Sequence, residues 1–412
     1  MNSTLANRQA VSSPNPTGSP PAAEYNVPLG RLRAFVTALV VAHHAVLAYH
    51  PWAPPPPETL DSPIRWWQAF PVVDEQRWTG WALFVGWNDL FFMALMFFLS
   101  GLFTWSSLRR KGGGGFALGR LLRLGLPFVL AAGVLAPLAY YPAYLQTPAD
   151  RHSVAVFWSQ WRAIGTWPAG PAWFIWVLLA FGGAAAALHT IAPRWAESAH
   201  RAASPLLRRP SLFAVALILV SGAVYIPMAA HFGPLAWKAW GPFCFQTSRI
   251  LLYAVYFAVG IIVGAGPPDQ TLLSPDGRLA RRWMVWAATA LVAFIASNEI
   301  PAAAMTHNSP LWLIGFVSHA VMPVSCAASS LALMAVFVRF ERSRQPILES
   351  FCAAAYGVYL VHYPVVSWTQ YALLPWHQSA AIKGFAVTFA GILLSWGLVA
   401  LARRWRLLAR LI

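Results

Sequence analysis

The stretch RLRAFVTALVVAHHAVLAY, which runs from Arg31 to Tyr49, is an apolar run with an arginine pair at its start and a histidine pair inside it. It is long enough to cross a lipid bilayer as one helix. Charged or titratable side chains at membrane depth are costly, and for that reason they are candidates for a functional site. The placement of this helix therefore bears on both the fold and the chemistry of the chain.

Helical geometry links the two pairs. Arg33 and His44 are eleven residues apart, which is about three helical turns, so they face the same side within roughly 20°. The imidazole then lies about 16 Å further into the membrane than the guanidinium, near the middle of a hydrocarbon core about 30 Å thick. Thr37 lies on the same stripe, whereas His43 points about 80–100° away. A cation at the mouth and a candidate base at the centre suit a substrate with an anionic head and a reactive far end.

The composition is that of an integral membrane protein. Of the 412 residues, 58% are hydrophobic, 10% are charged and 22 are Trp, whereas an ordinary soluble domain has about 25% charged residues. Residues 1–27 are rich in Ser, Pro and Asn, and we expect them to form a disordered cytoplasmic tail. Cys244, Cys326 and Cys352 lie in apolar segments without metal-ligand spacing, so we expect neither disulfides nor a metal cofactor.

Apolar runs long enough to span a bilayer recur along the chain. They predict an all-α fold, a polytopic transmembrane helix bundle of about ten helices. Because one run is longer than a single span requires, nine or eleven spans remain alternatives. The ten runs cover residues 31–50, 82–105, 124–145, 171–192, 211–231, 244–265, 283–300, 310–338, 347–374 and 381–402.

The basic residues test this arrangement. With the N-terminus in the cytoplasm, 22 of the 29 Lys and Arg residues fall in inner segments and six in outer loops, while Arg249 falls inside a span. Such an excess of inner basic residues is what the positive-inside rule predicts. We therefore expect both termini in the cytoplasm, a membrane domain at 28–406 and a cytoplasmic tail at 407–412. The net charge of +16 then needs no nucleic acid as a partner.

Four stretches together resemble the acyltransferase-3 family of membrane acyltransferases. Their order and separations are similar to those of the family, and they extend over nearly the whole membrane region. The LRAF start at Leu32–Phe35 and residues 97–127 are also similar to the branch that succinylates periplasmic glucans. The four stretches are Arg33-x10-His44, FFLSGLF at Phe97–Phe103 followed by Arg120-Leu-Leu-Arg123 and Pro127, PAWFIWVLLAF at Pro171–Phe181, and YGVYLVHYPV at Tyr356–Val365.

This resemblance implies an enzyme of a bacterial-type inner membrane that acylates a hydroxyl of a carbohydrate, for example by O-acetylation of a glycan, polysaccharide or glycolipid. The donor would be a cytoplasmic acyl-CoA, such as acetyl-CoA or succinyl-CoA. The acceptor, a carbohydrate or lipid-linked compound, is often at the outer face in this family. The resemblance also implies that the arginine–histidine motif, here Arg33 and His44, is essential, and that the R-x-x-R segment, here Arg120 to Arg123, takes part in binding the acyl donor.

Acyl transfer from a thioester to a hydroxyl needs a base, help for the tetrahedral oxyanion and a grip on the phosphates of the donor. His44 is the best candidate for the catalytic base, because an imidazole titrates near neutral pH. Arg33, at the cytoplasmic mouth, and the pair Arg120 and Arg123 are candidates for binding the donor, since arginine forms bidentate contacts with phosphate groups. Plain positive-inside topology is the alternative for Arg120 and Arg123.

Asp89 is the only acid well inside a predicted span, at a depth close to that of His44. We predict that Asp89 orients this imidazole, as a carboxylate orients a catalytic histidine. An interfacial acid that faces water is the alternative. Arg249 is a candidate partner for Asp89 or for an anionic intermediate.

Three further polar residues are weaker candidates for a role in the site. His43 suits packing or a supporting contact to His44. Ser100 suits close helix packing beside Gly101, with a role as nucleophile as the alternative. His362, in the YLVHYP segment, suits structural support.

A polytopic transporter or flippase is the main alternative function. It would use Arg33, His44, Asp89 and Arg249 as a translocation path, because intramembrane titratable residues fit transport as well as catalysis. A sensor or structural membrane protein, in which these residues would tolerate substitution, is a third hypothesis.

Overall fold

The structure, a computed structural model, describes residues 27–63, 65–148, 151–267, 272–307, 309–341, 343, 345–405 and 408–410. In this part of the chain nearly all regular structure is helical, with one antiparallel hairpin formed by two short strands. The predicted all-α class is therefore confirmed. The tail predicted at 1–27 lies outside the described residues except for Val27, which already belongs to the first helix. Of the tail predicted at 407–412, the structure describes residues 408–410.

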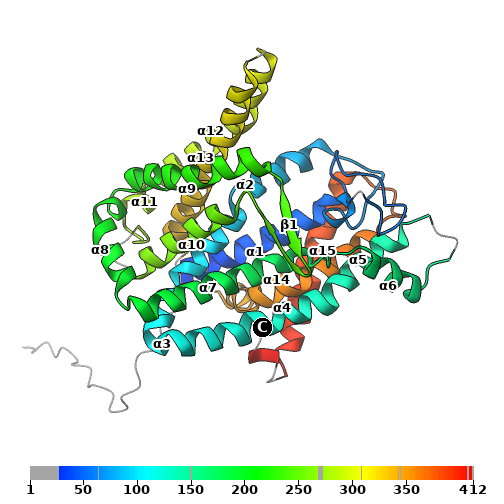
Figure 1. The fold of residues 1–412 in the computed structure, drawn as a ribbon, viewed down its shortest axis with the longest axis horizontal. Helices are drawn as coiled ribbons and strands as arrows, with labels where there is room; N and C mark the ends of the chain where they lie inside the picture. The colour runs from blue at the N-terminus through cyan, green and yellow to red at the C-terminus, as the bar shows by residue number, and fades with distance from the viewer. Residues whose placement is uncertain are drawn as a thin grey trace, which may run out of the picture.

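The helices assemble side by side into a bundle that is crossed on one side by the hairpin (Figure 1). Elements η1, η4 and η6 are 3-10 helices, and η2 and η3 are π-helices. In chain order the elements are α1 (Val27–Leu47), η1 (Trp66–Gln68), α2 (Thr79–Leu102), α3 (Thr104–Arg120), η2 (Leu121–Gly125), α4 (Leu126–Leu130), η3 (Ala131–Leu135), α5 (Ala136–Leu145), α6 (Val154–Ala163), η4 (Gly170–Ala172), α7 (Trp173–Ile191), α8 (Trp195–Leu207), α9 (Pro210–Phe232), β1 (Trp237–Trp240), β2 (Phe243–Gln246), α10 (Ile250–Gly264), α11 (Arg278–Arg281), α12 (Trp283–Thr306), α13 (Leu311–Phe340), α14 (Pro346–Ala372), α15 (Ala380–Ala402) and η6 (Leu408–Arg410).

Each predicted membrane segment falls mainly on helix. Within the described residues, eight helices or helical runs are long and apolar enough to cross a membrane. The other two predicted spans fall on α10, whose 15 residues extend about 22 Å, and on α14, which has 27 residues. The chain is thus a multi-pass membrane protein, with eight spans that meet the length and apolarity criterion and two further helices at the remaining predicted positions.

The sixth predicted span begins too early. Residues 244–249 were expected to be helical, but Cys244 lies in β2 and Arg249 is the residue that precedes the first turn of α10. The reason is the hairpin, whose turn includes Gly241 with a φ of +56°, a left-handed conformation that glycine adopts at little cost. Arg249 is therefore at the end of a helix and not inside a span.

The segment that carries the R-x-x-R motif, which lies between two predicted spans, is helical throughout. Residues 104–145 form one continuous helical run of 42 residues. A kink at Gly112, where φ is +69°, turns the run without ending it. The two π-helical segments η2 and η3 follow, and such segments are frequent at functional sites.

Contacts along helix pairs show that the helices alternate in direction. Arg31 on α1 pairs with Glu341 at the end of α13, and Phe35, one turn later, packs on the earlier residue Phe337, so these two helices are antiparallel. The helices α1 and α14 are parallel, because Ala34 packs in a cluster with Ala355 while residue 44 meets residue 362. This agrees with their predicted positions as first, eighth and ninth spans.

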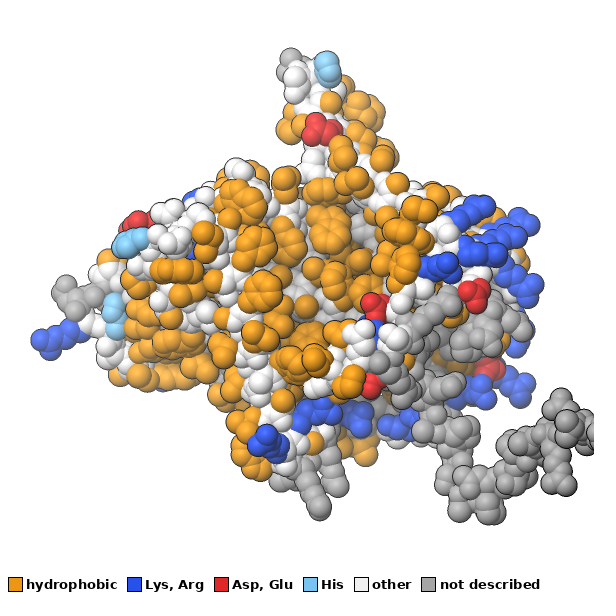
Figure 2. Space-filling view, turned by 180° about the vertical axis from the view of Figure 1, so that it is seen from behind, with side chains coloured by type: hydrophobic (Ala, Val, Ile, Leu, Met, Phe, Trp, Pro, Cys, Tyr) orange, Lys and Arg blue, Asp and Glu red, His pale blue; other side chains and the backbone are white. Residues whose placement is uncertain are grey.

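The last helix returns to the starting end of α1. Phe351 of α14 packs on Trp396 of α15, whereas Val366 of α14 lies against Gly391, so α15 is antiparallel to both α14 and α1. The start of α1 and the end of α15 are therefore at the same end of the bundle. Figure 2 shows hydrophobic side chains over the middle of the molecule, with Lys and Arg gathered mainly toward its edges. That this end is cytoplasmic stays a prediction from the charge distribution.

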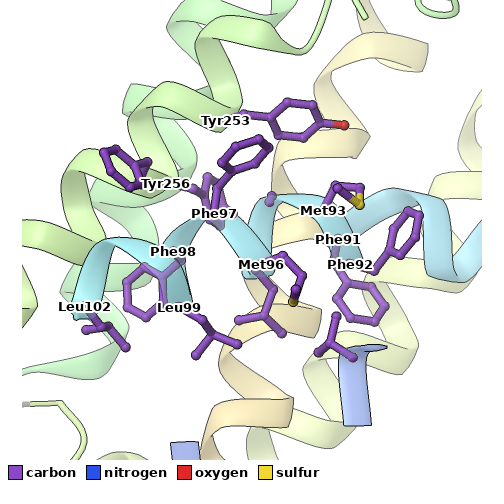
Figure 3. Close-up of a cluster of buried hydrophobic side chains, with 14 of the residues drawn as sticks. Phe91, Phe92, Met93, Met96, Phe97, Phe98, Leu99, Leu102, Tyr253 and Tyr256 are labelled. Carbon is purple, nitrogen blue, oxygen red and sulfur yellow. The ribbon is translucent and has the colours of Figure 1, made fainter. Parts of the chain in front are cut away.

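Close backbone packing joins α2 to α10. Figure 3 shows Phe97 of α2 beside Tyr253 of α10, with Met96 on the opposite side of the α2 ribbon. A Cβ atom added to Gly260 would lie 2.2 Å from the carbonyl oxygen of Phe98. Small residues at four-residue spacing permit this approach of two membrane helices, and the contact sets the position of α2 against the rest of the bundle.

The segment between α1 and α2 is fastened over the end of α1 by a buried ion pair. Lys383 of α15 donates to Asp74 at 2.6 Å, and the two side chains are 2% and 3% exposed. The backbone N–H of Asp74 donates to the carbonyl oxygen of Ala48, and Arg77 donates to that of His50. Burial and the nearby Arg77 guanidinium lower the pKa of His50.

We predict that Gly260→Ala lowers the stability of the protein by roughly 1–3 kcal/mol, because the added methyl group overpacks the contact between α2 and α10. Thermal unfolding in detergent measures the change. Gly86→Ala is the matched control on α2, since a Cβ at Gly86 would meet no atom within 4 Å. Equal melting temperatures for the two variants would contradict the close approach.

Replacing Lys383 by Met leaves the carboxylate of Asp74 buried without its cation, and we expect a loss of about 3–5 kcal/mol. The double variant Lys383→Met/Asp74→Asn removes the unpaired charge and should recover part of that loss. Denaturant unfolding of the two variants makes the comparison. A double variant less stable than the single one would show that the pair is not what fastens the segment.

Candidate active site

The structure places Arg33 and His44 on α1 as predicted. The two arginines at the start of this helix, Arg31 and Arg33, differ in burial and in their partners. Arg31 is buried, pairs with Glu341 and donates to the backbone carbonyl of Ser343. Arg33 is half-buried, and in the described part of the chain its side chain has no hydrogen-bond or ion-pair partner; its Nε atom is buried and unsatisfied. The hydroxyl of Thr37 donates to the carbonyl oxygen of Arg33 at 3.0 Å. Of these two arginines, Arg33 is thus the one whose guanidinium has no protein partner in the described residues.

His44 has partners on its own helix and on α14. Its Nδ1 atom lies 2.8 Å from the carbonyl oxygen of Val40 and 3.2 Å from Nε2 of His362. The ring of Tyr363 meets the His44 ring edge-on at 5.1 Å between centroids. The half-buried imidazole of His44 is therefore held from two helices.

The end of α1 that carries His44 is fully capped. A helix leaves its last four carbonyl groups without partners in the helix. Gln370 of α14 donates to the carbonyl oxygens of His44 and Ala45, at 2.9 Å each. The next two carbonyls, of Val46 and Leu47, accept from the following backbone N–H groups. Since lipid offers no replacement partners, this capping fixes the backbone beneath the candidate base.

His43 faces a different helix. Its ring stacks on Phe92 of α2 at 5.1 Å and lies 5.4 Å from the ring of His44. Its Nδ1 atom is buried without a hydrogen-bond partner in the described residues. The packing role predicted for His43 agrees with this position, and the roughly perpendicular directions of the two histidines agree with helical geometry.

The predicted contact between Asp89 and His44 is wrong. The carboxylate of Asp89 accepts a hydrogen bond from Arg249 at 2.8 Å, and Arg249 also donates to the backbone carbonyl of Asp89. The Arg249 side chain is 7% exposed and that of Asp89 is 39% exposed. A buried guanidinium needs a counter-charge more than a neutral imidazole needs an orienting group, so the ion pair forms across α2 and the start of α10. The alternative pairing of Asp89 with Arg249 is the one observed.

Arg120 and Arg123 lie where the long helical run passes α7 and α14. Arg120 is half-buried, donates to the hydroxyl of Thr104 at 3.3 Å and lies 5.0 Å above the ring of Phe116. Arg123 is exposed in the π-helix η2, and its carbonyl oxygen accepts from the hydroxyl of Tyr356 at 2.8 Å. The two guanidinium groups form no ion pair in the described residues.

Helix α14 connects these cations to the histidines. Tyr356, bonded to Arg123, is six residues before His362, or about 9 Å along the helix. On the other side of the same turn, Ala34, the neighbour of Arg33, packs against Ala355. Residue 34, next to Arg33, and the backbone of Arg123 therefore contact neighbouring residues of α14, and His362 and His44 meet further along this helix.

The remaining candidates have structural contacts. The hydroxyl of Ser100 donates to the carbonyl oxygen of Met96 at 2.8 Å, and the next residue, Gly101, packs against the backbone of α10, which favours the helix-packing role. Among the described residues, no group of three His, Cys, Asp or Glu is placed to hold a metal ion. A cavity of about 20 Å³ lies beside Tyr359 and Tyr363 of α14.

A family model described as an acyltransferase domain matches residues 29–400. The chain belongs to the acyltransferase-3 family. This membership establishes an acyltransferase built as a multi-pass membrane protein, and it agrees with the resemblance of the four sequence stretches. No curated protein and no solved structure matches the chain.

His362 is the residue of the site that sequence reasoning assigned to structural support alone. It is fully buried, and its Nδ1 atom lies 2.6 Å from the carbonyl oxygen of Tyr359. The sequence feature that could have identified His362 as a site residue is the same as for His44, namely a titratable side chain inside an apolar helix. Its contact with His44 joins positions 318 residues apart, a distance over which no local pattern acts.

We predict that Asp89→Asn lowers stability by roughly 1–3 kcal/mol, because Arg249 loses its counter-charge. This is below the about 3–5 kcal/mol of a fully buried pair, since the Asp89 side chain is 39% exposed. Glu197→Gln, in the more exposed pair with Arg109 at 3.4 Å, is the control and should cost less than about 1 kcal/mol. Thermal unfolding measures both. An Asp89→Asn protein as stable as the Glu197→Gln protein would contradict a structural role for the buried pair.

Proposed function

We propose that this acyltransferase moves an acyl group from cytoplasmic acyl-CoA to a hydroxyl of a carbohydrate acceptor, with His44 as general base. The observation that supports this most is the arrangement along α1 and α14. Arg33 lies on α1 two residues after its paired neighbour Arg31, the backbone of Arg123 contacts α14 at Tyr356, and the candidate base lies about 16 Å along α1 from Arg33. An acyl-CoA has the same plan, with phosphates at one end of a long arm and a thioester at the other.

The donor end would be held by arginine. Arg33 has no protein partner in the described residues, and Arg123 is exposed, so both guanidinium groups are free to bind phosphate oxygens in bidentate fashion. Arg31 cannot serve in the same way, because Glu341 and Ser343 already occupy it. The donor would thus enter from the end of the bundle that carries the termini, which the positive-inside rule assigns to the cytoplasm.

The chemical step needs one proton acceptor. The unprotonated nitrogen of His44 takes the proton of the acceptor hydroxyl as its oxygen attacks the thioester carbonyl. The tetrahedral intermediate collapses with cleavage of the carbon–sulfur bond, and the imidazolium returns its proton to the leaving thiolate. The products are an ester of the acceptor and free coenzyme A, so atoms and charge balance without a metal or redox cofactor.

The acceptor would approach from the opposite end. His44 is three residues from the end of α1, and the outer segment held by Asp74 and Lys383 lies next to it. Aromatic side chains are exposed on the outer segments, among them Trp52 at 77% and Trp240 at 83%. Such rings stack on sugar faces, although they also suit a membrane interface. A bacterial-type inner membrane, with a glycan, polysaccharide or glycolipid acceptor outside, fits this arrangement.

Acyl transfer is favoured over transport. Transport would require the polar residues to form a path, but Asp89 and Arg249 are engaged with each other. The family match concerns acyl transfer. Both arguments support the enzyme and leave the carrier hypothesis without a specific observation in its favour.

We expect His44→Ala to lower the rate of acylation by about 10²–10⁴-fold, the usual contribution of a positioned general base, and Arg33→Ala to raise the KM for acyl-CoA. The assay uses purified protein in nanodiscs with acetyl-CoA or succinyl-CoA, and follows release of coenzyme A in the presence of sugar acceptors. Mass spectrometry of surface glycans from cells with and without the protein identifies the acceptor.

Two control variants accompany this assay. His231→Ala replaces an exposed histidine, and Arg110→Ala replaces an exposed arginine of the inner segment; both should keep normal activity. All four proteins should accumulate in the membrane to similar levels. Full acylation by the His44→Ala protein would overturn the proposed mechanism, and proton-coupled uptake in vesicles without any acyl donor would favour transport.

A further inference from the structure

His362 lies in the middle of α14 with no exposed surface, and its ring reaches His44 from the facing helix. The ring centroids are 5.1 Å apart and the planes are inclined by 52°. A titratable side chain buried at membrane depth is costly, so a second imidazole beside the candidate base requires a physical reason.

The hydrogen-bond partners determine which nitrogen atoms carry protons. Nδ1 of His362 lies 2.6 Å from the carbonyl oxygen of Tyr359, and a carbonyl oxygen can only accept, so His362 holds its proton on Nδ1. Its Nε2 then presents a lone pair toward His44. Nδ1 of His44 lies 2.8 Å from the carbonyl oxygen of Val40 and 3.2 Å from that lone pair. It too must be a donor, shared between two acceptors.

The free lone pair of His44 is therefore on Nε2. In the opposite tautomer, Nδ1 would point a lone pair at two acceptors, and both contacts would become repulsive. The carbonyl oxygen of Val40 restrains the His44 ring from the preceding turn of α1, and the ring of His362 restrains it from α14. Together they select one tautomer and limit rotation of the ring.

We propose that His362 is a positioning residue, which holds His44 as the Nδ1–H tautomer so that Nε2 is the atom that accepts the proton of the acceptor hydroxyl. The inference rests on the proposed function. During the step Nε2 gains a proton, Nδ1–H remains shared between Val40 and His362, and His362 keeps its own proton. When the thiolate leaves, the proton on Nε2 moves to it and the original tautomer is restored.

Among the described residues, the other polar or titratable side chains near His44 are engaged elsewhere. Asp89 is engaged with Arg249, and His43 stacks on Phe92. The hydroxyl of Tyr363 is directed to Tyr140 and the carbonyl oxygen of Gln68, at 3.4 Å each. In Ser-His-Asp triads a carboxylate orients the catalytic imidazole. A neutral imidazole can do the same without adding a charge to a site at membrane depth, where an unpaired charge would be costly.

The first test compares three variants in the acylation assay. His362→Met fills the space without a comparable acceptor, and we expect kcat to fall about 10- to 100-fold, the range for groups that orient histidines elsewhere, with the KM for acyl-CoA unchanged. His362→Gln offers an amide oxygen near the position of Nε2 and should recover part of this loss. Ser367→Ala is the control on α14, since Ser367 is also fully buried and donates only to the carbonyl oxygen of Tyr363.

The second test reads the tautomer directly. Nitrogen-15 NMR of histidine-labelled protein in nanodiscs distinguishes protonated from unprotonated ring nitrogens, and His44→Gln identifies the signals of His44. We expect a protonated Nδ1 and an unprotonated Nε2 for His44 in the unaltered protein, and a mixture of tautomers in His362→Met. An unchanged tautomer in His362→Met, or equal losses of kcat in the Gln and Met variants, would overturn the positioning role.

The experiments distinguish failure of the proposed role of His44 from failure of the proposed role of His362. If His44→Ala retains full activity, the proposed function of His44 is wrong, whatever His362 does. If His44→Ala is inactive while His362→Met is fully active, the general base stands and the positioning role is wrong.

Discussion

The contact between α1 and α14 is the constraint on which the site depends. Inside lipid, a polar group has only protein partners, and these two parallel helices supply each other with them. Gln370 satisfies the last carbonyls of α1, and His362 meets the side chain of His44. A displacement of α14 would therefore disturb the backbone and the imidazole of the candidate base together, and neither could find a substitute in the membrane.

The rest of the bundle keeps this contact in place from both ends. At the end where α1 begins, Tyr356 donates to the backbone of Arg123 and Arg31 ties α1 to Glu341. At the opposite end, the ion pair of Lys383 and Asp74 holds a segment over α1. Helix α2, fixed by glycine contacts to α10, packs Phe92 against His43. Each restraint acts on α1 or α14, so the stability of the fold and the geometry of the site have the same origin.

The sequence predicted the features that depend on local hydrophobic pattern and on the distribution of charge. Apolar length located the long helices of the bundle, and the eleven-residue spacing predicted Arg33 and His44 on one face of α1. The hairpin before Ile250 was not predicted, because its turn depends on the left-handed conformation of Gly241. The prediction that Asp89 contacts His44 was also wrong. It rested on their similar depth along the membrane normal, which does not determine where two residues lie around the bundle, and there Asp89 is next to Arg249.

The ion pairs of the described residues separate Arg33 from the buried cations of the bundle. Arg31, Arg249 and Lys383 each have a carboxylate partner, and each of these pairs joins segments that are distant in sequence, so it serves the fold. In the described residues Arg33 has none. A half-buried cation without a partner is unfavourable, and a bound anion removes that cost. Binding of an anionic donor to Arg33 would then stabilise the folded protein as well as position the donor, which couples occupancy of the inner end to the order of the helix that carries His44.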